Sequence, residues 1–383
     1  MDKQLGQKFC LSTKALSKPM VTEIELQTGT LLIESGDELV NLCGFASRKN
    51  TKRGFLFLSK VLGKHYPSCP DEMREVHETL ANKIRPILKE GPTVVIGFCE
   101  TATSLGYGVY ESLDLTDSYY HHSTRHKIDR PIFLTFSESH SHATDHYLYL
   151  PENLIHQSIL NNPANIIFVD DEYTTGNTLL NTIAAFKKKG IVSNFIATGI
   201  LDWTDKTTKS NLLPELVSLV KGNFSFSSNN YSPSSQHVSE CNFSLVHKDL
   251  STPYGRVGCE KLSIDFKNLI PSLPKRNDRV LVIGTGEFMN VSYLLAGFLK
   301  SYSSAVFVQS TTRSPIMLGN DVQSLLEFKD NYGEQVDNFL YNVKNQSYDH
   351  VYVCYETATY PSEHTLYQQL NQLFPNVILV NFN

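Results

Sequence analysis

The sequence lacks paired cysteines, long apolar runs and an excess of basic charge, and each absence narrows the class of protein. Its seven cysteines are scattered, odd in number and form no C-x-x-C, which favours reduced thiols over a disulfide framework. No apolar run approaches the ~20 residues that span a bilayer, and MDKQLGQKFCLSTKALSK at the N-terminus has no sustained apolar region of a secretion signal. The net charge of −5 offers no electrostatic case for nucleic acid. We therefore expect a cytoplasmic protein without nucleic-acid or membrane partners.

The pattern that is present predicts an α/β protein. The chain has 383 residues, which is too long for one ordinary core and predicts two domains, with three as the alternative. Short apolar strands alternate with amphipathic helical stretches. Strands are predicted at 93–98, 132–136, 166–170, 195–201, 279–284, 305–309, 350–354 and 377–382, and helices near 72–89, 102–113 and 177–189.

A stretch rich in serine and asparagine separates two halves of this pattern. Residues 223–236, NFSFSSNNYSPSSQ, predict a loop or linker. We therefore predict a first domain at 1–220, a connecting segment at 221–265 and a smaller α/β domain at 266–383. Residues 94–113 and 280–299 repeat a layout of strand, glycine, acid and helix. Either both domains use a strand-to-helix loop as a site, or the glycines only reflect ordinary α/β architecture.

The stretch IIFVDDEYTTGNTLLN (166–181) places three acids at the end of an apolar strand, directly before a short loop. Such a strand is expected inside a parallel sheet, whose ligands bind beyond the carboxyl ends of the strands. The loop leads into a helix, so its free amides and the helix dipole favour a phosphate, and Gly176 allows a positive φ. Acids beside an anion loop fit a sugar phosphate. The alternative is a solvated strand end and an ordinary helix start. The residues concerned are Asp170, Asp171, Glu172, Thr174, Thr175, Gly176, Asn177 and Thr178.

This stretch resembles the signature of type I phosphoribosyltransferases. In that family the acids hold the ribose hydroxyls of phosphoribosyl pyrophosphate (PRPP), and the loop cradles its 5′-phosphate. The resemblance implies that Asp170 and Asp171 are the acid pair with a catalytic role, and that residues 174–178 are the phosphate loop. It also implies Mg²⁺ bound through PRPP rather than through protein ligands.

A PRPP site needs a second anion site for pyrophosphate, and two segments are candidates. GFCETATSLG (97–106) resembles the pyrophosphate loop of the family. Its acid either needs Mg²⁺ or an amine beside the pyrophosphate or complements the dipole of a first helical turn. FASRKNTKRGFLFLSKVLGKHYP (45–67) carries cations and no acid, so it predicts either a local positive field or a solvated face. The residues chosen are Glu100, Thr101, Ala102 and Thr103 from the first segment, and Arg53, Lys60 and Lys64 from the second, with Lys60 catalytic.

Histidines gather in FSESHSHATDH (136–146), which contains His140, His142 and His146. A pKa near neutrality favours acceptor binding or proton transfer, with His140 as the catalytic candidate. Zinc or iron ligation is the alternative, and ordinary satisfied histidines are another. Upstream, HHSTRHKIDR (121–130) is a candidate for the mobile loop that type I enzymes close over the ligand, or merely an exposed basic loop. Its Arg125, with Lys127 and Arg130, would then stabilise the leaving pyrophosphate.

In order along the chain, RKNTKRGFLFLSKVLGKH, GFCETATSLG, SESHSHATDH and VDDEYTTGNT resemble phosphoribosyltransferase-like proteins associated with bacterial tellurite-resistance and stress-response gene clusters. In that family a TRSP domain follows, matched here by LVIGTGEFM (281–289), QSTTRSPI (309–316) and FLYNV (339–343). Gly284 and Gly286 lack the third glycine of a dinucleotide fingerprint, and Arg313 suits a phosphate or a carboxylate.

The resemblance implies transfer of ribose 5-phosphate from PRPP to an unidentified base or amine, in nucleotide or nucleoside biosynthesis or a stress response. A PRPP sensor without catalysis is one alternative, and a metal-dependent hydrolase built on the three histidines is another. The oligomeric state is left open, with a homodimer as one candidate.

Overall fold

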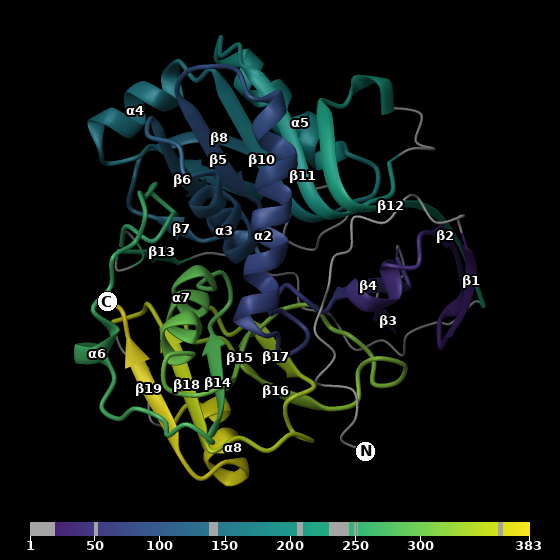
Figure 1. The fold of residues 1–383 in the computed structure, drawn as a ribbon, viewed down its shortest axis with the longest axis vertical. Helices are drawn as coiled ribbons and strands as arrows, with labels where there is room; N and C mark the ends of the chain where they lie inside the picture. The colour runs from purple at the N-terminus through teal and green to yellow at the C-terminus, as the bar shows by residue number, and fades with distance from the viewer. Residues whose placement is uncertain are drawn as a thin grey trace.

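The structure, a computed structural model, describes residues 20–49, 53–137, 145–204, 210–229, 245–248, 250, 252–358 and 363–383. Two sheets organise it: a seven-stranded large sheet in the upper half of Figure 1 and a four-stranded small sheet in the lower half. The large sheet has the order β1 (Met20–Leu26), β2 (Gly29–Ser35), β12 (Glu215–Ser228), β11 (Asn194–Asp202), β10 (Asn165–Tyr173), β5 (Thr93–Gly97) and β6 (Ser118–His122).

The five strands from β12 to β6 are parallel, and β11, β10, β5 and β6 are buried on both faces over most of their length. Alternate residues of a strand point to opposite faces, so Val95 and Ile167 enter one core while Val94 and Ile166 enter the other. The first core is covered by α2 (Pro70–Ile84), which the short turn η1 (Arg85–Ile87) continues, and by α3 (Thr103–Leu113). The second is covered by α4 (Leu154–Asn161) and α5 (Asn177–Lys188).

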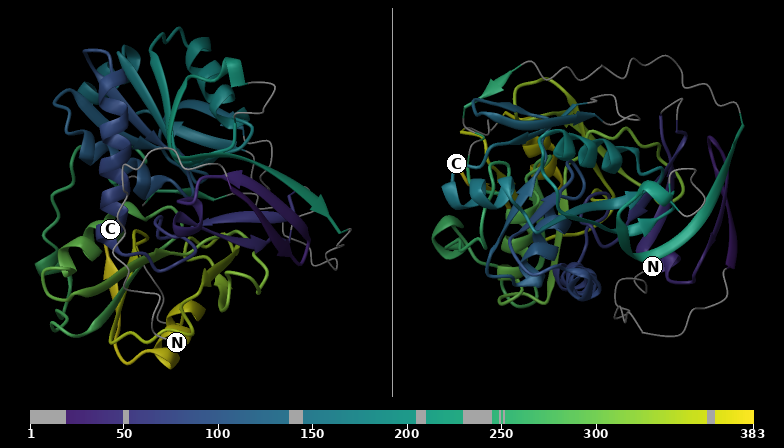
Figure 2. Two further views of the ribbon diagram at one scale, coloured as in Figure 1. Left: turned by 45° about the vertical axis from the view of Figure 1, so that its right-hand side comes forward. Right: turned by 90° about the horizontal axis from the view of Figure 1, so that it is seen from above.

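Strand β12 is long enough to serve two partners. Residues 215–221 pair in parallel with β11, and residues 222–228 pair antiparallel with β2. The β1–β2 hairpin thereby extends the large sheet away from its centre (Figure 2). Residues 223–228 are therefore strand, and the loop predicted there is wrong, because pairing with β2 outweighs the turn-forming tendency of serine and asparagine.

The small sheet is fully parallel, with the order β15 (Ala305–Ser310), β14 (Arg279–Gly284), β18 (His350–Tyr355) and β19 (Val377–Asn381). Helix α7 (Asn290–Leu299) covers one face and α8 (Thr365–Leu373) the other. Helix α7 faces α2 and α3 of the large sheet, so the two halves pack helix against helix.

Shorter elements complete the described chain. Four strand pairs stand apart from the two sheets: β3 (Cys43–Ser47) with β4 (Phe55–Ser59), β8 (Ile132–Ser137) with β9 (Asp145–Tyr149), β16 (Leu325–Lys329) with β17 (Asp337–Tyr341), and β7 (Lys127–Ile128) with β13 (Val246–His247). The remaining helices are α1 (Leu39–Leu42), η2 (Ser210–Leu212) and α6 (Phe266–Leu269). Within the described ranges, no helix is both long and apolar enough to cross a membrane.

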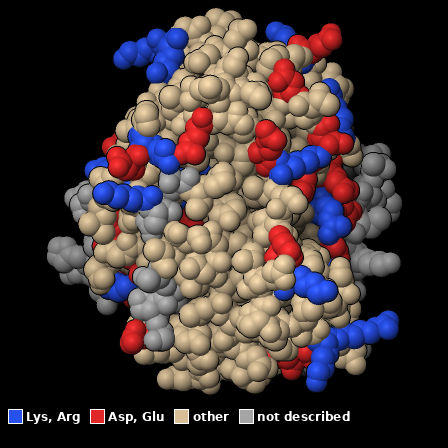
Figure 3. Space-filling model, turned by 90° about the vertical axis from the view of Figure 1, so that its left-hand side faces the viewer, with Lys and Arg blue, Asp and Glu red and all other residues tan. Residues whose placement is uncertain are grey.

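The predicted fold class, a parallel-sheet α/β domain followed by a smaller α/β domain, is confirmed. Every predicted strand and helix forms, but 132–136 joins the β8–β9 hairpin instead of the central sheet. On the face shown in Figure 3, acidic and basic side chains intermingle around a broad area of other residues.

Candidate active site

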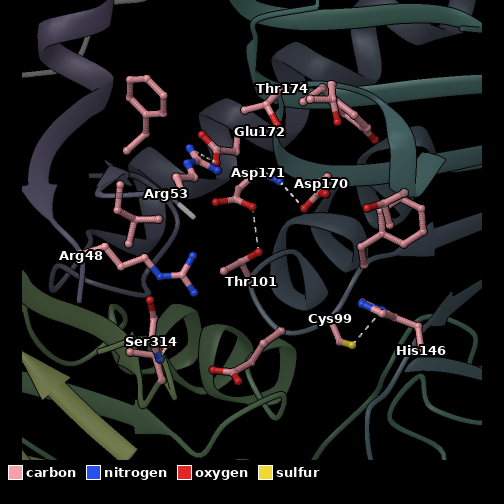
Figure 4. Close-up of a pocket in the computed structure, with 18 of the residues that line it drawn as sticks. Arg48, Arg53, Cys99, Thr101, His146, Asp170, Asp171, Glu172, Thr174 and Ser314 are labelled. Carbon is pink, nitrogen blue, oxygen red and sulfur yellow. Dashed lines mark hydrogen bonds and ion pairs between the residues drawn. The ribbon is translucent and has the colours of Figure 1, made fainter. Parts of the chain in front are cut away.

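A pocket opens at the carboxyl ends of β5 and β10, where six separate segments meet (Figure 4). They are the β3–β4 hairpin with the residues after it, the loop after β5, Arg125 after β6, His146 of β9, the end of β10 with the loop after it, and the segment after β15. Asp171 and Gly176 line the same pocket. The acids and the anion loop of the 166–181 motif therefore face one cavity, as a sugar phosphate ligand would require.

The end of β10 presents its acids in a defined order. The Asp171 N–H donates to Oδ1 of Asp170 at 2.9 Å, and the Thr101 hydroxyl donates to Oδ1 of Asp171 at 2.7 Å. The pocket thus joins the loops after β5 and β10 directly. All eight motif residues line it: Asp170, Asp171, Glu172, Thr174, Thr175, Gly176, Asn177 and Thr178.

Gly176 starts α5 with a backbone that favours glycine. Its φ is +70°, and a Cβ there would lie 2.5 Å from Cδ2 of Leu213. Because α5 begins at Asn177, the amides of its first turn lie at the pocket, where Asn177 and Thr178 line the wall. The helix dipole adds partial positive charge at the same place.

Glu100, the acid of the predicted pyrophosphate loop, is paired with two cations. Lys64 Nζ lies 2.7 Å from one carboxylate oxygen, and Arg313 Nε lies 2.8 Å from the other. Burial alone would raise the pKa of Glu100, but the two cations hold it at about 2. The ammonium of Lys64 and the guanidinium of Arg313 therefore lie beside this acid, and the place of a pyrophosphate stays a prediction. The first-turn alternative is wrong, because α3 begins at Thr103 and has no acid in its first turn.

The other predicted residues of this loop divide between pocket and interior. Thr101 lines the pocket. Ala102 and Thr103 are fully buried behind it, and the Thr103 hydroxyl donates to the backbone carbonyl of Glu287 at 2.8 Å. The loop after β5 therefore rests on the half of the molecule that contains the small sheet.

The cations predicted from 45–67 do not all reach the pocket. Arg53 lines it and its Nη2 lies 2.7 Å from Glu172, although burial still raises the pKa of that carboxyl. Lys64 is fully buried behind the wall, where burial lowers its pKa despite the carboxylate of Glu100. Lys60 does not line the pocket: its ammonium donates to the carbonyl of Val40 at 2.9 Å, so its predicted catalytic place is wrong.

The histidine cluster is only partly within the described residues. His140 and His142 lie outside them. His146 lines the pocket, stacks on Phe136 and places Nδ1 3.3 Å from Sγ of Cys99 and 3.2 Å from Oγ of Ser123. Burial raises the pKa of the Cys99 thiol. Among the described residues no three His, Cys, Asp or Glu side chains are grouped to hold a metal ion.

Residues 121–130 do not form an exposed loop. His121 and His122 end β6, Thr124 exchanges two backbone hydrogen bonds with Tyr147, and β7 pairs with β13. Arg125 lines the pocket. Neither loop interpretation fits the other two basic residues of this segment. Lys127 belongs to β7, and Arg130 forms an ion pair with Glu152.

Several pocket residues are not among those chosen from the sequence, although Arg48 and His65 belong to the predicted basic segment 45–67. They are Arg48, Leu56, Phe57, His65, Phe98, Cys99, Tyr173, Leu179, Thr312, Arg313, Ser314 and Pro315. Arg48 points toward the cavity from the β3–β4 hairpin, opposite Asp171 (Figure 4). The sequence identifies Arg313 only as a residue that suits a phosphate or a carboxylate, because nothing in its spacing connects it with residues 100 or 171.

The loop after β14 is buried against the large sheet rather than open to a ligand. The Glu287 carboxylate accepts hydrogen bonds from the Thr124 hydroxyl at 2.5 Å and from the Arg125 N–H at 2.9 Å. Arg256 lies 3.3 Å from the same carboxylate, and Lys64 donates to the Gly286 carbonyl at 2.9 Å. The two strand–glycine–acid–helix units are therefore packed against each other at one junction.

Comparison with known proteins defines the class of this chain. Residues 42–222 match the family described as phosphoribosyl transferase, and these residues include β5, β10 and most of the pocket. Residues 260–372 match the TRSP domain, described as lying C-terminal to that transferase domain. The chain therefore belongs to the family in which a phosphoribosyl transferase domain is followed by a TRSP domain.

Solved structures with similarity to the chain include adenine phosphoribosyltransferases. An APRTase of Giardia lamblia has 15% identity, covers 48% of this chain and 96% of its own, and has a TM-score of 0.35. The enzyme of Rhodothermus marinus has 16% identity, with 48% and 97% covered and a TM-score of 0.34. That of Trypanosoma brucei has 14% identity, with 53% and 87% covered and a TM-score of 0.35. No curated protein matches the chain.

Proposed function

We propose that the chain transfers ribose 5-phosphate from PRPP to a nitrogen of a base or amine and releases pyrophosphate. The observation that carries the proposal is the shared pocket of Asp171 and Gly176, which brings carboxylates and an anion loop to one cavity. The family match to a phosphoribosyl transferase domain supports the same chemistry. The pathway and the acceptor stay predictions.

The end of β10 would hold the sugar of PRPP. The carboxylates of Asp170 and Asp171 accept hydrogen bonds from the ribose hydroxyls, while the amides and hydroxyls of residues 174–178 bind the 5′-phosphate. As the bond at C1 breaks, positive charge grows on the ribose ring. Negative charge held beside the ring stabilises that state more than the ground state.

The leaving group would lie toward the loop after β5 and the pocket arginines. The C1–O bond breaks, its electron pair leaves on a pyrophosphate oxygen, and the acceptor nitrogen supplies the pair that forms the C1–N bond. A proton carried by that nitrogen passes to solvent or to a base. Arg125 and Arg48, which both line the pocket, are placed to offset the charge of the pyrophosphate.

Magnesium is expected to arrive with the substrate. Mg²⁺ prefers oxygen ligands, keeps several waters and takes one or two carboxylates together with substrate phosphates. Asp170 and Asp171 supply such oxygens at the pocket. The donor set therefore fits an ion shared with PRPP, which would neutralise phosphate charge.

The double variant Asp170→Asn, Asp171→Asn tests the proposal. An asparagine oxygen can still accept the hydrogen bonds from the Asp171 N–H and the Thr101 hydroxyl, so the fold should survive. We expect pyrophosphate release, measured with PRPP, Mg²⁺ and a panel of bases and amines, to fall at least a hundredfold.

Asp71→Asn with Asp114→Asn is the matched control, because both carboxylates lie on the surface of the same half and outside the pocket. Its pyrophosphate release should equal that of the unaltered chain. Unchanged turnover in the pocket variant would contradict the proposal.

The alternatives give different results in the same assays. A sensor would bind PRPP in a calorimetric titration and release no pyrophosphate with any acceptor. A hydrolase built on His140, His142 and His146 would copurify with metal, and His140→Ala would remove both the metal and the activity.

A further inference from the structure

We propose that Arg313 binds the pyrophosphate group of PRPP, so that the TRSP domain supplies part of the substrate site of the transferase domain. The inference rests on the proposed function and extends it, because it adds a binding residue from the half of the chain outside the phosphoribosyl transferase match. It also gives the TRSP domain a role at the reacting end of the pocket.

The segment that carries Arg313 is held firmly at the pocket. Residues 312–315 follow β15 and line the cavity. Thr312 exchanges two backbone hydrogen bonds with Phe339, at 2.9 and 2.7 Å, and its hydroxyl accepts from the Ser314 N–H at 3.2 Å. Ser314 faces the cavity opposite Asp171 in Figure 4. The guanidinium is thus presented by a segment fixed to the small-sheet half.

The trio of Glu100, Lys64 and Arg313 presents one accessible cation at this wall. Both cations lie within 3 Å of Glu100, and Nη2 of Arg313 also lies 3.9 Å from the carboxylate of Glu287. Lys64 is fully buried and donates to the Gly286 carbonyl, whereas the side chain of Arg313 retains 14% exposure and lines the pocket. Arg313 is therefore the cation of this trio that a ligand can reach.

A second observation indicates that a polar ligand group reaches the same wall. His65 lines the pocket and is 3% exposed, and neither ring nitrogen has a hydrogen-bond partner among the described residues. Burial, together with Lys64, lowers the pKa of His65 to about 3, so the ring is neutral and can donate one hydrogen bond and accept another. A buried imidazole normally has a partner, and a phosphate oxygen is a suitable one.

The first experiment compares three ligands by calorimetric titration: Mg²⁺ with PRPP, Mg²⁺ with pyrophosphate, and ribose 5-phosphate. Arg313→Gln should weaken binding of PRPP and pyrophosphate roughly ten- to hundredfold, as loss of charge-assisted hydrogen bonds predicts. Ribose 5-phosphate should bind within about twofold of the unaltered chain, which also shows that the variant is folded. Arg276→Gln, an exposed arginine of the same half, is the control and should bind all three ligands normally.

The second experiment separates direct binding from mere neutralisation of Glu100. If Arg313 only offset that carboxylate, adding Glu100→Gln to Arg313→Gln would restore PRPP affinity. We expect the double variant to stay at least tenfold weaker, and restoration to within twofold would overturn the inference.

Different results would overturn the proposed function and the role of Arg313. An unaltered chain that binds none of the three ligands would overturn the proposed function and this inference with it. PRPP binding that Arg313→Gln retains, or an equal loss for all three ligands, would overturn the inference alone.

Discussion

Among single residues, Glu100 has an environment that strongly alters its chemistry. Its pKa lies near 2 instead of the ordinary 4.5 because Lys64 and Arg313 outweigh the effect of burial. A carboxyl whose pKa is lower in the folded state adds stability above its ordinary pKa, and that stability is lost as the pH falls from about 4.5 toward 2.

Glu100→Gln should therefore change both the size and the pH dependence of stability. Removing one partner strands buried cations, so the free energy of unfolding at pH 7 should fall by about 3 kcal/mol. Its decline between pH 4.5 and 2 should become shallower than in the unaltered chain. Urea unfolding at several pH values measures both. Asp71→Asn, which removes surface ion pairs with Arg74 and Lys300, should cost about 1 kcal/mol or less. An unchanged acid slope in the Glu100 variant would contradict the assignment.

Gly176 allows a second test at this scale. Gly176→Ala should lower the free energy of unfolding by about 1–2 kcal/mol, because its φ of +70° strains a residue with a Cβ. The added Cβ also displaces Leu213, so affinity for ribose 5-phosphate should fall. Gly190→Ala is the matched control, since its φ is +81° and nothing lies within 4 Å of the new Cβ. It should lose similar stability and no affinity. Equal loss of affinity in both would show that the loop is not the phosphate site.

Among the secondary-structure elements, the helices α3 and α7 each contain a glycine, and only the one in α7 has room for a Cβ. A Cβ on Gly108 of α3 would lie 1.9 Å from the His77 ring, so α2 and α3 approach closely only with glycine there. A Cβ on Gly297 of α7 would meet nothing within 4 Å. The same substitution should thus have opposite effects on stability in the two helices.

Gly297→Ala should raise the free energy of unfolding by about 0.5–1 kcal/mol, because alanine restricts the unfolded chain and favours helix. Gly108→Ala should lower it by about 1–3 kcal/mol, because the buried ring has no room to move. Urea denaturation followed by far-UV circular dichroism measures both. Two changes of the same sign would contradict the packing described for α2 against α3.

For the molecule as a whole, Arg256 connects the two sheets through buried charge. It makes two hydrogen bonds to Glu356, at 2.7 and 2.8 Å, and lies 3.3 Å from Glu287, which in turn binds Thr124. Arg256→Met would leave both carboxylates without this cation and should lower the free energy of unfolding by about 3–5 kcal/mol.

The single tryptophan makes the cooperativity of the two halves measurable. Trp203 follows β11 and stacks on Phe57, so its fluorescence reports on the large-sheet half, whereas far-UV circular dichroism reports on both. In Arg256→Met both signals should shift to lower urea by the same amount. Arg279→Met, which removes an arginine packed over Phe307, should lower the free energy of unfolding by about 1 kcal/mol or less. A shift in circular dichroism without a shift in fluorescence would contradict a shared junction.

Much of the fold could be predicted because its central strands are short apolar runs buried on both faces. The strands of the small sheet and the pair β5 and β10 follow from that pattern alone. The β1–β2 hairpin and residues 223–228 do not, because their polar, alternating residues become strand only by pairing across the chain. The division at 221–265 stays a proposal.

The sequence alone determined the end of the candidate site that we propose binds the sugar phosphate, because the acids, the glycine and the helix start lie within 16 consecutive residues whose local geometry brings them together. Only the tertiary structure decided what surrounds the other end. Glu100, Lys64 and Arg313 are distant in the chain, so only folding brings the two cations beside the buried carboxylate. Tertiary packing likewise places Lys60 outside the pocket and Arg313 at its wall.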